Sequence, residues 1–60
     1  MIIFEGDFVR PTGKQQWLEV VGIVDHMHIQ LSNGVYAEAS ERSISQVLSA
    51  NEYKQQELRL

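Results

Sequence analysis

Apolar residues occupy every second position from Met27 to Leu31 and again from Val35 to Ala39. A period of two is typical of β-strands with one face toward a core and one toward water. Between the two segments, Ser32-Asn33-Gly34 has the composition of a tight turn, with Gly34 able to take the left-handed conformation of a three-residue hairpin loop. The pattern therefore predicts a β-hairpin.

The register of this hairpin follows from which residues must face the core. A two-residue Asn-Gly turn would pair Ile29 with Glu38 and place a carboxylate on the apolar face. A three-residue loop instead turns six apolar residues toward the core as three pairs: Leu31 with Val35, Ile29 with Ala37 and Met27 with Ala39. The opposite face then carries two polar pairs: Gln30 with Tyr36 and His28 with Glu38.

Three more segments rich in β-branched and aromatic residues lie before the hairpin, separated by the turn signals Gly6-Asp7 and Pro11-Thr12-Gly13. They are Ile2 to Phe4, Phe8 to Arg10 and Trp17 to Val24. In the last of these, Leu18 and Val20 differ in parity from Ile23, so we expect a β-bulge at Val21-Gly22 that turns Ile23 inward. Several short strands this closely spaced predict an all-β fold, a sandwich or a small five-stranded barrel, and a length of 60 residues favours the barrel.

Strand and helix both remain open for residues 41–48. Ile44, Val47 and Leu48 have helical spacing, but residues 44–48 could equally form a closing strand. Ser49-Ala50-Asn51-Glu52 has the form of a capping box, which predicts a short C-terminal helix. We therefore expect a barrel over residues 1–48 and a helical tail over residues 49–60.

The chain has 60 residues, of which 43% are hydrophobic and 22% charged, and it contains no cysteine. A core this small has no disulfide or thiolate metal site to support it, and an intracellular, reducing compartment fits this composition best. The N-terminus lacks the features of a signal peptide, and no apolar run approaches the roughly 20 residues of a membrane span. We expect a soluble protein without a membrane partner.

Gly6-Asp7-Phe8-Val9-Arg10, the segment from Trp17 to Ile23, Ile29-Gln30-Leu31 and Gly34 resemble the small SH3-like barrels. Within that group the chain is similar to KOW and Tudor-type modules and to short bacterial proteins that begin "G-D-x-V". The resemblance covers roughly residues 3 to 39. It implies a strongly bent five-stranded barrel whose loops and exposed aromatic side chains bind peptide, nucleic acid or another protein surface.

Three outward-facing aromatic residues are the main candidates for binding. Side chains alternate between the two faces of a strand, so the arrangement that buries Val9, Leu18 and Val35 turns their neighbours outward or toward loops. These neighbours are Phe8, Trp17 and Tyr36. Clustered exposed rings are favoured at interfaces, although in so small a protein they could also be core, with Trp17 capping one barrel end. The candidate binding residues are Phe8, Trp17, Tyr36, Gln30 and His28.

Metal binding and catalysis are weaker possibilities. His26 and His28 lie two residues apart on one predicted strand face and could chelate a metal with Glu38 or Gln30, but metal sites normally need three or four ligands. A core this small leaves no room for the roughly 300 Å³ cleft of a typical ligand site. We expect neither a metal, nor another cofactor, nor enzymatic activity.

The leading hypothesis is a non-catalytic module that recognises a protein or peptide through its aromatic surface. An alternative is a nucleic-acid-associated regulator using Arg10, Lys14 and Arg42, which the net charge of −3 disfavours. A small structural subunit is a third possibility.

Self-association depends on the opening segment. Ile2, Ile3 and Phe4 place apolar side chains on both faces of their predicted strand, and a small barrel buries only one face. The other face needs cover from a second copy or from the tail, through Tyr53, Leu58 and Leu60. We favour the tail, and hence a monomer.

Overall fold

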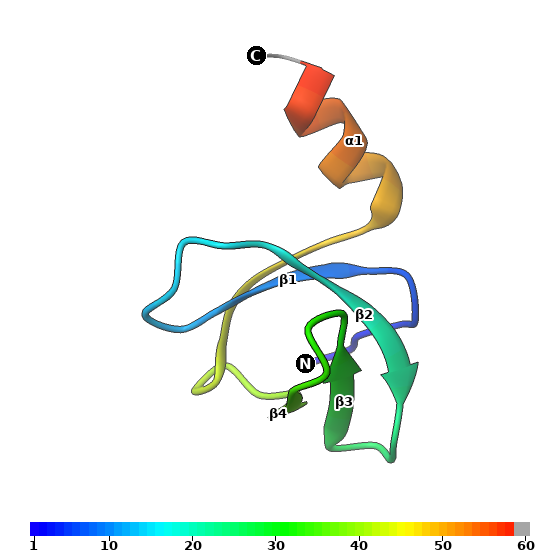
Figure 1. The fold of residues 1–60 in the computed structure, drawn as a ribbon, viewed down its shortest axis with the longest axis vertical. Helices are drawn as coiled ribbons and strands as arrows, with labels where there is room; N and C mark the ends of the chain where they lie inside the picture. Colours follow the sequence, from blue (N-terminus) through cyan, green and yellow to red (C-terminus); the bar gives the residue numbers. More distant parts are fainter. Residues whose placement is uncertain (59–60) are drawn as a thin grey trace.

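The computed structural model describes residues 1–58 and contains five β-strands followed by one α-helix (Figure 1). The strands are β1 (Phe8–Pro11), β2 (Leu18–Ile23), β3 (His28–Leu31), β4 (Tyr36–Glu38) and β5 (Ile44–Leu48), and the helix is α1 (Ala50–Leu58). The prediction of a mainly β chain with a short C-terminal helix is confirmed. Within residues 1–58, no helix is long and apolar enough to cross a membrane.

The strands form one antiparallel sheet in the order β4-β3-β2-β1-β5. The sheet bends at β2, whose first residues pair with β1 and whose last residues pair with β3. The register shifts between Val20 and Gly22, which confirms the predicted bulge. Over the described range β4 and β5 are the two edges, so the sheet does not close on itself as the predicted barrel would.

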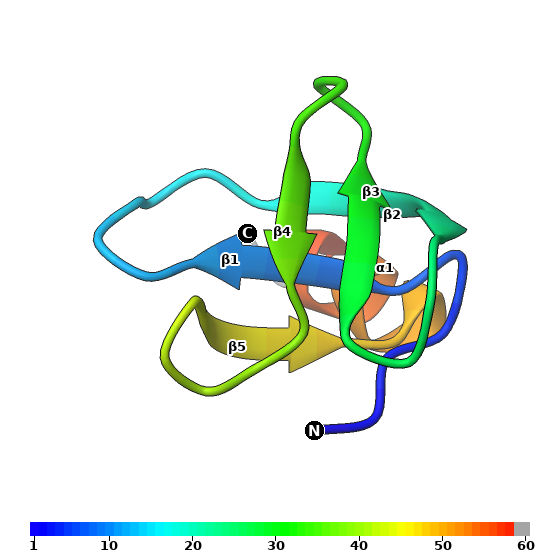
Figure 2. The ribbon, with the colours of Figure 1, turned by 90° about the horizontal axis from the view of Figure 1, so that it is seen from below.

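Bending turns the sheet into two layers that cross each other. Figure 2 shows the β3–β4 hairpin crossing β1 and β5, and the apolar core lies between these layers. Six buried residues form the core: Val9, Leu18, Val20, Ile29, Leu31 and Ile44. Partly buried Ile3, Ala37, Ala39 and Val47 pack against it.

The hairpin has the predicted register. Ile29 pairs with Ala37, the Leu31 N–H donates to the Val35 carbonyl at 2.8 Å, and Gly34 has a φ of +88°. The prediction that the apolar residues of this hairpin all face the core is wrong for Met27 and Val35, which are exposed. Met27 immediately precedes β3 and Val35 immediately precedes β4, so both lie at the ends of the hairpin rather than within its strands.

The bulge places Ile23 opposite the buried Ile29, on the same face of the sheet, as predicted. Ile23 is the last residue of β2, and its side chain is nevertheless 47% exposed.

Residues 2–4 form no strand, which corrects the prediction for the opening segment. A turn forms instead, in which the Phe4 N–H donates to Asp7 Oδ2 at 2.9 Å and the Asp7 N–H donates to the Phe4 carbonyl at 3.0 Å. Ile3 packs against the core, whereas Ile2 and Phe4 are exposed. The carboxylate of Asp7 accepts the hydrogen bond that the Phe4 N–H would otherwise donate to a neighbouring strand.

The open alternative for residues 41–48 resolves as strand β5, which pairs with β1. The capping box is confirmed, since the Glu52 N–H donates to Ser49 Oγ at 3.2 Å and the Ser49 N–H donates to Glu52 Oε1 at 2.9 Å. Of the expected docking residues, Tyr53 contacts the aromatic side chain of Phe8, but Leu58 is 85% exposed and does not dock. Leu60 lies outside the described residues.

Candidate functional site

A groove of about 410 Å³ lies between the β1–β2 loop and the β3–β4 hairpin. We refer to it as the hairpin groove. Its lining residues come from both loops and from the strands between them: Pro11, Lys14, Gln16, Leu18, Leu31, Asn33, Val35 and Ala37.

Hydrogen-bonded turns hold both walls of the hairpin groove. In the β1–β2 loop, the Lys14 N–H donates to the Pro11 carbonyl at 3.0 Å, and the Thr12 N–H donates to the Ser43 carbonyl at 2.9 Å. In the hairpin loop, the Gly34 N–H donates to the Leu31 carbonyl at 2.9 Å, and the Val35 N–H donates to Asn33 Oδ1 at 3.1 Å. These bonds fix the backbone of each loop, so each wall of the groove has a defined shape.

The chemistry of the hairpin groove combines apolar contact with one positive charge. Leu18 and Leu31 are buried core residues, and Val35 is 54% exposed. Within the described range, Lys14 is the only charged residue of the lining, although the chain as a whole carries a net charge of −3. Such a lining suits an apolar side chain next to a carboxylate.

No pattern in the sequence indicates this groove. The expectation that so small a core leaves no room for a cleft of roughly 300 Å³ is wrong, because the hairpin groove has a volume of about 410 Å³. The space is not inside the core, because two loops that are distant in sequence enclose it at the edge of the core. The turn signals at Gly13 and Gly34 are visible in the sequence, but the sequence does not show that Lys14 and Asn33 beside them line one groove.

Phe8 and Trp17, two of the predicted binding residues, meet at a third ring. Tyr53 of α1 stacks on Phe8 with ring centroids 4.0 Å apart and an interplanar angle of 6°. The ring of Trp17 meets Tyr53 edge-on, at 5.9 Å and 61°. We call Phe8, Trp17 and Tyr53 the aromatic cluster; all three side chains are half-buried and none belongs to the buried core.

Tyr36, Gln30 and His28 lie apart from that cluster on the β3–β4 hairpin. Tyr36 is exposed and pairs with Gln30, and His28 pairs with Glu38, as the register predicts. The structure thus joins Phe8 and Trp17 through Tyr53 but places Tyr36 on another element. The sequence singled out Tyr53 as a docking residue for the opening segment, residues 2–4, whereas its ring docks on Phe8 and Trp17.

The environment of Tyr53 favours its neutral phenol. Burial raises the pKa of Tyr53 above its ordinary value, and the neighbouring carboxylate of Glu57 raises it further. Docking of α1 is therefore linked to the protonated state of this phenol.

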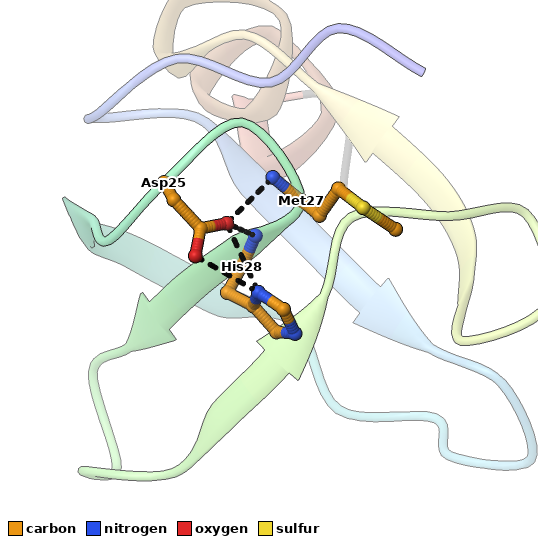
Figure 3. A network of polar contacts seen from close by, with 3 residues as sticks. All are labelled: Asp25, Met27 and His28. Atoms are coloured by element: carbon orange, nitrogen blue, oxygen red, sulfur yellow. Dashed lines mark hydrogen bonds and ion pairs between the residues drawn. The ribbon is translucent and has the colours of Figure 1, made fainter.

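Figure 3 shows a polar turn centred on Asp25, which connects β2 to β3. Asp25 Oδ1 accepts the N–H of Met27 at 2.8 Å and that of His28 at 2.9 Å, and His28 Nδ1 lies 2.9 Å from the same oxygen. These donors, the Met27 N–H first, lower the pKa of Asp25 below its ordinary value. The site is exposed and structural in character, because its contacts are all within the turn.

The histidine pair does not have the predicted arrangement. β3 begins at His28, so His26 lies in the turn and the two imidazoles do not share a strand. Among residues 1–58, no three side chains of His, Cys, Asp or Glu gather closely enough to hold a metal ion.

The three basic residues of the nucleic-acid alternative occupy three segments. Arg10 lies half-buried on β1, Lys14 lies in the β1–β2 loop, and Arg42 is exposed in the turn before β5. The Thr12–Ser43 hydrogen bond brings the Arg42 turn beside the end of β1. Nucleic-acid binding through these residues stays a prediction.

Comparisons of this chain with protein-family models, with curated proteins and with solved structures find no match.

Proposed function

We propose that the protein is a non-catalytic binding module that takes a peptide segment of a partner protein into the hairpin groove. The observation that carries this proposal is a largely apolar groove of about 410 Å³ between two hydrogen-bonded loops. Ligand sites in proteins are typically clefts of roughly 300–1,000 Å³ with an apolar lining and a few placed polar groups.

The chemistry of the lining defines the peptide. Leu18, Leu31 and Val35 suit an aliphatic side chain, and Lys14 suits a carboxylate next to it. A segment that places a Leu, Ile or Val beside an Asp or Glu would satisfy both. The acidic charge of the rest of the chain would keep such a peptide away from other surfaces.

We also infer that the domain belongs to the SH3-like class, as the resemblance of residues 3–39 implies, with its sheet open between the edge strands β4 and β5. Five short antiparallel strands, a bulged and bent β2, and two crossing layers support this class. Peptide binding in a groove beside the loops agrees with membership of the SH3-like class.

A displayed library of random peptides, selected on the intact protein, tests the proposed function. The selected peptides are then measured against Val35→Glu and against Val24→Glu as a matched control. The two valines are 54% and 56% exposed, but only Val35 lines the groove. Both variants add the same charge at equally exposed positions.

We expect peptides that combine an aliphatic and an acidic residue, and at least a tenfold loss of affinity in Val35→Glu with little change in Val24→Glu. Lys14→Gln should weaken binding several-fold and reduce its dependence on salt. Equal binding by the two valine variants, or selection of no peptide at all, would overturn the proposal.

A further inference from the structure

Only one side chain of the helix α1, that of Tyr53, packs partly out of solvent against the sheet. None of its nine residues is buried, and Tyr53 is the only one that is even half-buried. Leu58 is 85% exposed. A helix that packs on a sheet normally buries an apolar stripe. Because α1 lacks one, the contact of Tyr53 decides whether the helix is docked.

The surface beneath Tyr53 belongs to the sheet and does not depend on the helix. Phe8 lies on β1, paired with Leu48 of β5 on one side and with Glu19 of β2 on the other. Trp17 immediately precedes β2. The strand ladder therefore holds Phe8 in place whether or not Tyr53 covers it, and Trp17 is joined directly to Leu18, which pairs with Val9 in the same ladder. We refer to the surface of Phe8 and Trp17 as the aromatic seat.

The geometry of Tyr53 shows which chemistry the aromatic seat accepts. One face of the tyrosine ring lies flat on Phe8 at 4.0 Å, and Trp17 meets it edge-on at 5.9 Å. Stacked and edge-to-face arrangements are the two favourable geometries for aromatic pairs. A tyrosine or phenylalanine ring from elsewhere would find the same contacts.

Trp17 also remains accessible beside the docked helix. It lines a cavity of about 370 Å³ with Gln46, Leu48 and Gln55, and another of about 240 Å³ with Tyr53 and Gln56. An incoming side chain can therefore contact Trp17 before Tyr53 leaves.

We propose that the aromatic seat is a docking site for a partner-protein segment that presents a Tyr or Phe ring, and that Tyr53 is its internal, displaceable occupant. This surface is separate from the hairpin groove, and the proposal stands or fails independently of the proposed function. A helix of nine residues is marginal on its own, so α1 should unfold once Tyr53 is displaced.

Competition by Tyr53 sets the size of the expected effect. The contact energy of one aromatic pair favours the state in which Tyr53 occupies the aromatic seat by roughly tenfold over the state in which it does not. A competing segment should therefore bind the wild-type chain about tenfold more weakly than a chain whose seat is empty.

The test uses the full chain and a synthetic peptide with the sequence of residues 49–58 as the probe. Trp17, the only tryptophan, reports binding by its fluorescence, and backbone amide shifts locate it. The proteins are wild type, Tyr53→Ala, Tyr53→Ala combined with Phe8→Leu, and Leu58→Ala as a control that alters the exposed part of the same helix.

We expect the peptide to bind Tyr53→Ala about tenfold more tightly than wild type or Leu58→Ala. A peptide with alanine in place of its tyrosine should not bind, and adding Phe8→Leu should abolish binding. Should Tyr53→Ala fail to fold, Tyr53→Leu replaces the aromatic contact with a weaker aliphatic one, and a smaller gain over wild type is expected.

The proposal is wrong if the peptide binds wild type and the Tyr53 variant with equal affinity, or does not bind the Tyr53 variant at all. It is also wrong if the peptides with and without tyrosine bind equally. A wild-type dimer in sedimentation that Tyr53→Ala dissociates would also overturn it, because the occupant would then be the helix of a second copy.

Discussion

Tyr53 lies flat against Phe8, with 4.0 Å between ring centroids and 6° between ring planes, and this contact fastens the C-terminal helix to the sheet. The two residues are far apart in sequence, and Trp17 completes the contact edge-on.

The stability of the domain should depend on this pair. Tyr53→Ala should lower the free energy of unfolding by about 1 kcal/mol, and a double-mutant cycle with Phe8→Ala should give a coupling energy of about 0.5–1.5 kcal/mol. Urea melts followed by circular dichroism measure both. Leu58→Ala, at an exposed position, should stay within about 0.5 kcal/mol of wild type. A coupling energy near zero would mean that the stacked rings do not hold the helix.

Alkaline pH should undock α1. Folding raises the pKa of Tyr53 above its ordinary value of 10.0, so its contribution to stability is complete below about pH 10 and is lost as the pH rises through the raised pKa. In Tyr36→Phe, Tyr53 is the only tyrosine, and its ionisation can be followed by tyrosinate absorbance together with Trp17 fluorescence. Glu57→Gln should bring the pKa closer to 10.0. Ionisation of Tyr53 at the pH of a free tyrosine would contradict this.

Acid should weaken the β2–β3 turn. The N–H donors around Asp25 lower its pKa below the ordinary 3.8, so the stability that its charge contributes is present above about pH 3.8 and is lost as the pH falls through the lowered pKa. The stability difference between wild type and Asp25→Asn should therefore shrink in strong acid. The measurement is thermal melting of both proteins at neutral and acidic pH, and a difference that does not change with pH would refute the linkage.

Substitution by alanine should lower the stability of the protein more at Gly34, in the β3–β4 loop, than at Gly22, in β2. Gly34 has a φ of +88° with open space around its missing side chain, so Gly34→Ala should destabilise by about 1 kcal/mol through backbone strain alone. Gly22 has no positive φ, and an added methyl group would meet Gln30 at an ordinary 3.8 Å. Gly22→Ala should therefore have the smaller effect in urea melts. The opposite order would contradict the assigned turn.

Features set by residues close together in the chain are predicted correctly from the sequence. The register around Gly34, the bulge at Gly22 and the capping box at Ser49 are set by residues within one turn or one hairpin, and all three are confirmed. Alternation and local hydrogen bonding suffice to specify them.

Features that depend on distant segments were less predictable. Met27 and Val35 continue the apolar alternation of the hairpin but are exposed at its ends, which the alternation does not encode. The seat of Tyr53 requires β1 and α1 to meet, and the hairpin groove requires two loops to face each other. The sequence placed Phe8, Trp17 and Tyr36 outward but could not show that Tyr53 covers the first two.

The most direct test of the hairpin groove is amide chemical-shift mapping of the labelled protein with a peptide chosen from the displayed library. We predict that the largest shifts fall on residues of the groove lining, led by Lys14, Leu31 and Val35, and that Val35→Glu abolishes them while Val24→Glu does not. Shifts concentrated on another surface and unchanged in Val35→Glu would contradict the assignment of the hairpin groove as the binding site.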